Sequence, residues 1–165
     1  MTNILIAYFS PTGHTKEFAQ EIARQTAGDL FEIRTNHFYP LEHDSCSLQA
    51  HQEQLEDFRP QLPSQVPNME MYDVVFIGHP IWWYREPMVI RTFYESYDFS
   101  GKRVVPFATS GDVDLENTIK DMKTYLSNAI IEEGLRLNSY AVATSQTKIS
   151  QWLKKLKEGV QHDKS

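Results

Sequence analysis

Nearly continuous apolar runs of strand length recur along the chain, and they restrict its fold more than any other feature. The clearest runs cover residues 4–9, 73–78 and 103–109, and weaker ones cover 31–33 and 135–143. A strand that is apolar on both faces needs cover on both faces, which is typical of a parallel sheet between two layers of helices. The runs therefore predict an α/β domain with a five-stranded parallel sheet.

Segments with a helical spacing of apolar residues separate these runs. Thr12 is available as the N-cap of the first helix. Pro106 lacks the N–H that an interior strand donates, so we expect either a local irregularity of that strand or an N–H position that faces no neighbour. The helices are predicted over 13–25, 88–97 and 114–131, with a last helix whose apolar residues are Ile149, Trp152, Leu153 and Leu156.

The segment 35–70 interrupts this alternation between the second and third strands. It holds four of the eight prolines, and a connection of this length is usually functional or a lid. A short helix inside it is predicted from the spacing of Leu48, Gln52, Leu55 and Phe58. We treat 1–165 as one domain with this long connection.

The same segment contains three histidines and the chain's single cysteine, Cys46. Their spacings do not fit a zinc site, so we predict no metal and regard Cys46 as an inert thiol. The histidines are His37, His43 and His51.

Charge and cysteine content limit the partners and the compartment. The formal net charge is −6, which gives no electrostatic drive toward nucleic acid. Residues 41–100 hold ten acids against three arginines, and 148–165 hold five lysines against two acids, so we expect an acidic face and a basic last helix. One cysteine excludes an internal disulfide. With neither a signal-peptide pattern nor an apolar run long enough to span a membrane, we expect a cytoplasmic protein.

The loops after the first, third and fourth strands should meet at the carboxyl ends of a doubly wound sheet, where ligands bind. The first of them runs into a helix N-terminus, and its free amides, the helix dipole and a glycine make it a candidate phosphate-binding loop. The same pattern also occurs at an ordinary hydroxyl-rich helix start. The loop contains Ser10, Thr12, Gly13, His14 and Thr15.

The other two loops carry groups that suit a planar ring. Aromatic side chains can stack on a heterocycle and exclude water from it, although these rings could instead cap the core. The small turn after the fourth strand offers amides to a carbonyl-rich ring edge. The chain lacks both the Rossmann dinucleotide fingerprint and the nucleotide-binding P-loop. The two loops contain Pro80, Ile81, Trp82, Trp83, Tyr84 and Thr109, Ser110, Gly111, Asp112.

Together these motifs resemble a flavodoxin, and more closely the flavodoxin-like group with a Pro-x-Trp-Trp loop. The resemblance spans nearly the whole chain. It implies a flavodoxin-like three-layer α/β/α sandwich with strand order 2-1-3-4-5 and non-covalently bound FMN. The motifs are Tyr8-Phe9-Ser10-x-Thr12-Gly13-x-Thr15, Gly78-x-Pro80-Ile81-Trp82-Trp83 with Pro87, and Tyr97-Asp98-Phe99-Ser100-Gly101-Lys102 running into the fourth strand and Ser110-Gly111.

Carried over by position, the resemblance implies that Ser10 and residues 12–15 hold the FMN phosphate, that 80–83 line the ring and that 109–112 close its other side. Two positions depart from the family pattern. His14 stands where asparagine is common, and Asp112-Val113-Asp114 stands where a glycine- and serine-rich turn is common. Carboxylates beside the ring would lower its reduction potential or weaken FMN binding.

The expected function is redox chemistry by FMN, with no side chain acting as a catalyst. One form is an electron carrier that docks on a redox partner through its acidic face. The other is a small reductase of quinone-type acceptors, with NAD(P)H as a transient electron donor. The alternative is a non-redox binding module that keeps the fold without the flavin, which Asp112 and Asp114 motivate. For the oligomeric state, a homodimer is kept as an alternative to a monomer.

Overall fold

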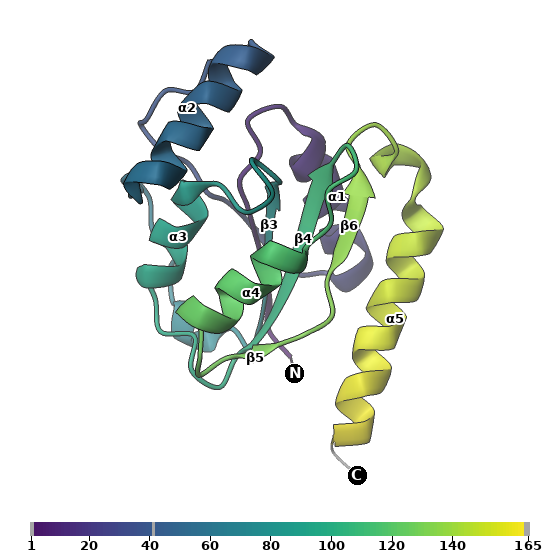
Figure 1. Ribbon diagram of the computed structural model, residues 1–165. Coiled ribbons are helices and arrows are strands. Elements are labelled where there is room, and N and C mark those ends of the chain that lie inside the picture. The colour runs from purple at the N-terminus through teal and green to yellow at the C-terminus, as the bar shows by residue number, and fades with distance from the viewer. Residues whose placement is uncertain (1, 41, 164–165) are drawn as a thin grey trace.

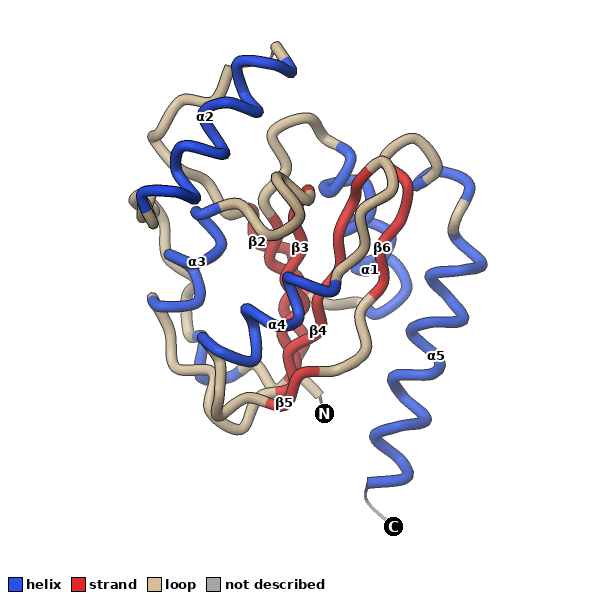
Figure 2. Tube along the Cα trace, viewed as in Figure 1, coloured by secondary structure: helices blue, strands red, loops and turns tan. Residues whose placement is uncertain are grey.

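The computed structural model describes residues 2–40 and 42–163, with side chains described up to residue 158. Its centre is one parallel sheet in the order β2-β1-β3-β4-β5, with β6 also paired to β4 (Figures 1 and 2). This confirms the predicted order. The strands are β1 (Ile4–Tyr8), β2 (Asp29–Glu32), β3 (Val74–Pro80), β4 (Arg103–Ser110), β5 (Ile130–Ile131) and β6 (Leu135–Asn138).

Helices cover both faces of the sheet, which explains why its inner strands are apolar throughout. One face packs on α1 (His14–Thr26) and α5 (Gln146–Asp163), and the other packs on α3 (Met88–Glu95) and α4 (Glu116–Tyr125). The largest fully buried side chains include Phe18 of α1 and Phe93 of α3, one in each core. No helix among the described residues has the length and apolar character needed to cross a bilayer.

The edge of the sheet beside β4 is divided opposite Pro106: of the two expectations for this proline, the N–H position without a neighbour is confirmed, whereas β4 itself is unbroken. Ile130 and Ile131 pair with Arg103 and Val104, and pairing then resumes only at Phe107 with Leu135. Pro106 cannot donate to the next strand, so the chain opposite it leaves the ladder. Gly134 passes so close that an added Cβ would lie 2.5 Å from the Pro106 carbonyl oxygen.

Two predicted elements end several residues earlier than expected, and in the first of them pairing with the sheet overrides local periodicity. The helix predicted over 114–131 ends at Tyr125, and Ile130–Ile131 instead form β5. The strand predicted over 135–143 ends at Asn138, and the residues after it form a turn and the short 3₁₀ helix Val142–Thr144.

The long connection contains the predicted helix, α2 (His43–Glu56), but with a different buried side. Leu48 and Leu55 are 71% and 70% exposed, whereas Ala50 and Glu53 are buried. Figure 1 shows why: α2 lies above α3, beyond the carboxyl ends of the strands, and not against the sheet. The short 3₁₀ helix Met69–Met71 then leads into β3.

Candidate cofactor site

The loop between β1 and α1 has the geometry of an anion-binding site. Gly13 is the N-cap of α1 with φ +95°, and a Cβ added there would meet nothing within 4 Å. The Ser10 hydroxyl accepts hydrogen bonds from the amides of Gly13 at 3.1 Å and Lys16 at 2.9 Å. The N-cap is therefore Gly13, and the prediction of Thr12 at that position is wrong; the Ser10 hydroxyl is the side-chain acceptor for the helix start. In the described chain the amides of residues 12, 14 and 15 donate to no acceptor.

A buried hydrogen bond joins this loop to the end of β4. The hydroxyls of Thr15 and Thr109 are 2.8 Å apart, and both side chains are buried. Each hydroxyl can donate only one proton, and one of the two is used within this pair. The main effect of the pair is therefore to hold the two loops in position relative to each other.

The turn after β4 is held by its own hydrogen bonds. The Ser110 hydroxyl donates to the carbonyl of Val113 at 2.6 Å, and the carbonyl of Gly111 accepts from Asn138 at 3.1 Å. Gly111 and Asp112 are exposed at the end of the sheet. The sequence did not indicate that β6 supports this turn. The contact joins Gly111 to Asn138, and the whole of α4 lies between these two residues in the chain.

The aromatic loop after β3 forms a tight turn, which we call the aromatic turn (residues 82–85). Trp82 and Arg85 exchange backbone hydrogen bonds at 2.9 and 3.3 Å, while Trp83 and Tyr84 adopt φ +51° and +70°. Positive φ at both central residues is the pattern of a type I′ turn, which normally selects asparagine and glycine. Two bulky residues in this conformation mark a strained turn of the kind found at functional sites.

Replacing Tyr84 by glycine is expected to raise the free energy of unfolding by a few tenths to about 1 kcal/mol, because glycine adopts positive φ without steric cost. Urea unfolding measures this change. Tyr140→Gly is the matched control: Tyr140 is 88% exposed but does not adopt positive φ, so its replacement should destabilise the protein. Equal destabilisation by both changes would contradict the strain at Tyr84.

Helix α2 holds the aromatic turn from above. The Gln54 amide donates to the Trp82 carbonyl at 2.7 Å, and the Trp83 indole N–H donates to the Ser47 carbonyl at 2.6 Å. His51 stacks on Trp83 with ring centroids 4.0 Å apart and an interplanar angle of 14°. The long connection thus supports the aromatic residues directly.

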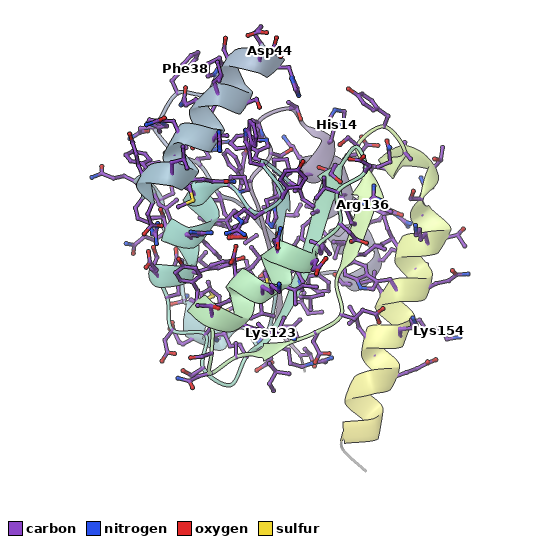
Figure 3. The ribbon with its side chains drawn as sticks, in the orientation of Figure 1. His14, Phe38, Asp44, Lys123, Arg136 and Lys154 are labelled. Carbon is purple, nitrogen blue, oxygen red and sulfur yellow. The ribbon has the colours of Figure 1, made fainter. Side chains whose placement is uncertain are left out.

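The loop between β1 and α1 (residues 10–15) is called the anion-binding loop below. A pocket of about 380 Å³ opens between this loop, the aromatic turn and α2. Of the predicted site residues, Thr12, Ile81, Trp82 and Trp83 line it. His14 lies at the same end of the molecule as Phe38 and Asp44, whereas Lys123 and Lys154 lie farther down (Figure 3). The lining residues that were not predicted are Pro11, Tyr39, Pro40, His43, Cys46, Ser47, Ala50 and Tyr140.

The remaining predicted residues are not among those that line the pocket. Tyr84 is 62% exposed on the outer side of the aromatic turn. His14 makes an edge-to-face contact with Tyr140, with ring centroids 5.1 Å apart. The others are Ser10, Gly13 and Thr15 in the first loop, Pro80 at the end of β3, and Thr109, Ser110, Gly111 and Asp112 after β4.

The missed pocket residues come mainly from the long connection. Tyr39 packs edge-to-face on Trp82 at 5.0 Å, and its hydroxyl donates to the buried Glu53 carboxylate at 2.7 Å. His37 Nε2 lies 3.1 Å from the same carboxylate. The four prolines and the length of this segment indicated a functional connection. Its sequence did not indicate which of its residues would make these contacts.

Cys46 lines the pocket from α2 and is half-buried. Burial, followed by the charge of Glu53, raises the pKa of its thiol. A thiol whose pKa is raised carries less thiolate at neutral pH, and the inertness of Cys46 stays a prediction.

The arrangement fits FMN in two separate respects. Unpaired amides and an unobstructed glycine at a helix N-terminus suit a phosphate, and they adjoin a pocket whose wall contains two indoles and two phenol rings. Aromatic walls of this kind suit a flat, largely apolar ring system. Residues 10–15 would hold the phosphate, and Trp82 with its neighbours would line the ring.

Solved structures of flavoproteins share this architecture over nearly their whole length. A candidate flavoprotein from Bacteroides uniformis ATCC 8492 is 34% identical with a TM-score of 0.81, and the match covers 93% of this chain and 98% of that chain. A second, from Bacteroides eggerthii DSM 20697, is 34% identical with a TM-score of 0.75 and coverage of 91% and 99%.

A more distant flavoprotein, from Lactobacillus acidophilus NCFM, was solved in complex with FMN. It is 19% identical with a TM-score of 0.74, and the match covers 87% of this chain and 98% of that chain, a likeness that shows the fold alone. No curated protein matches the sequence. The sequence profile of the family described as Flavodoxin matches residues 3–156. With that match over nearly its whole length, and with the predicted sheet order in place, the chain belongs to the flavodoxin family.

Proposed function

We propose that this chain binds FMN and acts as a small FMN-dependent oxidoreductase that reduces a planar, quinone-type acceptor. The observation that carries the proposal is the pocket between the anion-binding loop and the aromatic turn, with α2 as its third wall. FMN in that pocket would supply the redox chemistry, accepting electrons from a donor and passing them to the acceptor.

The residues of the chain have three tasks in this proposal. The amides of residues 12, 14 and 15 bind the phosphate, and Gly13 allows the backbone to approach it closely. Trp82, fixed edge-to-face against Phe9 at 5.6 Å and Tyr39 at 5.0 Å, orients the ring. Helix α2 and Trp83 limit the access of water to the pocket.

The wall formed by α2 favours a small acceptor over a protein partner. His43, Cys46 and Ser47 line the pocket from this helix, so a second flat molecule could enter the space while a protein surface would first meet α2. The carrier function is favoured by a different observation, the exposed apolar residues Phe38, Leu48 and Leu55 at the same end of the molecule. A docking partner would need a surface of that kind.

The test is a visible absorption spectrum of the purified protein after addition of FMN and removal of the excess, with the released cofactor identified by chromatography. Retained FMN with a perturbed band is the expected result, and folded protein without flavin would contradict the proposal. NAD(P)H oxidation with a soluble quinone then tests the reductase. Electron transfer only to a basic carrier protein, with strong salt dependence, would favour the carrier instead.

A further inference from the structure

A cluster of charged side chains is buried directly behind the aromatic turn. Glu86 follows the turn and is fully buried. Its Oε1 accepts a hydrogen bond from Arg91 Nε at 3.1 Å, whereas its Oε2 has no partner among the described residues. A buried carboxyl oxygen without a hydrogen-bond partner lowers the stability of the fold. We therefore expect this atom to carry a proton or to contact another polar group.

One edge of the Arg91 guanidinium serves two different carboxyl groups. Nε donates to Glu86, and Nη2 donates to Asp121 Oδ2 at 3.2 Å. These two nitrogens point the same way from one planar group, and a single carboxylate often accepts from both. Here the edge instead brings the two carboxyl groups within hydrogen-bonding reach of each other, which opposes the ionisation of both at once.

The surrounding charges decide which of the two holds the proton. Asp121 also lies 3.7 Å from Arg85 Nη1, so its charge has two cationic partners. Glu86 has one cationic partner and is the more deeply buried. Burial, followed by the neighbouring Asp121, raises the pKa of Glu86 to about 9.

Other titratable groups complete the cluster. Asp57, which follows α2 and is largely exposed, lies 3.4 Å from Arg91 Nη1, and the Tyr125 hydroxyl lies 3.4 Å from the same nitrogen. Tyr94 is buried beside the carboxyl pair, and burial, followed by the charges of Glu86 and Asp121, raises the pKa of its phenol. With its pKa raised, the Tyr94 phenol keeps its own proton at neutral pH.

We propose that Glu86 is protonated on Oε2 and donates a hydrogen bond to Asp121. This hydrogen bond links the residue that follows the aromatic turn to α4. Helix α4 already contacts the turn through Asn117, whose amide donates to the Tyr84 carbonyl at 3.1 Å. A strained turn persists only where its surroundings hold it. Loss of the proton places two negative charges in contact behind the turn and loosens it.

The fold therefore binds a proton that the unfolded chain releases. Glutamate in the unfolded chain ionises near its ordinary pKa of about 4.3, whereas in the folded protein the pKa of Glu86 is about 9. Its contribution to stability is complete below the lower pKa and is lost as pH rises toward the higher one. Through this group the folding equilibrium constant falls by up to about tenfold per pH unit over that range.

The experiment measures urea unfolding of the cofactor-free protein from about pH 5 to pH 9 for wild type, Glu86→Gln and the control Glu116→Gln, an exposed acid of α4. Glutamine keeps an acceptor for Arg91 and supplies a donor for Asp121. The folding constant of Glu86→Gln relative to wild type should rise on the order of 1,000-fold across this range, while that of Glu116→Gln stays constant. A constant ratio for Glu86→Gln overturns the proposal.

A second measurement uses the wild-type protein and does not depend on how the variants fold. Infrared difference spectra in D₂O should show a protonated carboxylic acid near neutral pH that titrates at alkaline pH, and the absence of this band overturns the proposal. The consequence for FMN, weaker binding at alkaline pH, rests on the proposed function. Failure to bind FMN at any pH would contradict that function and leave the unfolding result unaffected.

Discussion

Thr12→Asp is expected to weaken FMN binding by at least about 100-fold, because a carboxylate beside a phosphate dianion is repelled by several kcal/mol in a partly desolvated site. Thr12 is exposed at the edge of the pocket, so the change does not disturb the core. An acid at a helix N-terminus is favourable in the absence of the phosphate, worth about 0.3–1 kcal/mol. The cofactor-free variant should therefore be as stable as wild type or slightly more stable.

The control is Thr12→Asn, which is polar and uncharged and should bind FMN within a few-fold of wild type. Fluorescence titration of FMN gives the affinities, and thermal unfolding gives the stabilities. Unchanged affinity in folded Thr12→Asp would show that the phosphate does not bind in the loop after β1. Equal losses for aspartate and asparagine would indicate that the threonine hydroxyl matters and the charge does not.

Gly78→Ala is expected to destabilise the protein by about 3 kcal/mol, since it forces extra volume into a close-packed core. A Cβ at residue 78 would lie 2.1 Å from the ring of Phe107 on the neighbouring strand. That ring is fully buried and packs against Phe18, with centroids 4.8 Å apart, so it has little room to move. Urea unfolding gives the free energy.

Gly111→Ala is the matched control, because an added Cβ there meets nothing within 4 Å and the residue lies outside the left-handed region. Its effect should stay within about 0.5 kcal/mol. Shortening the opposing ring in Gly78→Ala/Phe107→Leu should recover part of the lost stability. A Gly78→Ala variant as stable as Gly111→Ala would contradict the close approach of β3 and β4.

Much of the fold and part of the site could be predicted, because their signals are local. An apolar run such as 73–78 must be buried on both faces wherever it lies, and the residue pattern around Gly13 forms a helix start with free amides in any context. Pro106 is a further local signal, since its missing N–H removes one ladder hydrogen bond on the side where that N–H would point, which here is the side of β5 and β6. The predicted bounds failed where Ile130–Ile131 left a helical pattern to pair with β4.

The aromatic turn shows the limit of such signals. Trp83 and Tyr84 are poor residues for positive φ, so local preference argues against the turn that they form. Tertiary hydrogen bonds hold the turn: Gln54 and Ser47 of α2 make them on one side, and Asn117 of α4 makes one on the other. None of these contacts has a sequence spacing that could be recognised in advance.

The sequence by itself therefore determined the layers, the strand order through the family resemblance, and the candidate phosphate loop. Only the tertiary structure decided that α2 lies over the strand ends and supplies a pocket wall, and that Glu86 and Asp121 meet at one arginine. The physical reason is range. Periodicity and capping act within a few residues, whereas a pocket wall or a shared proton requires that segments far apart in the chain be brought together by the finished core.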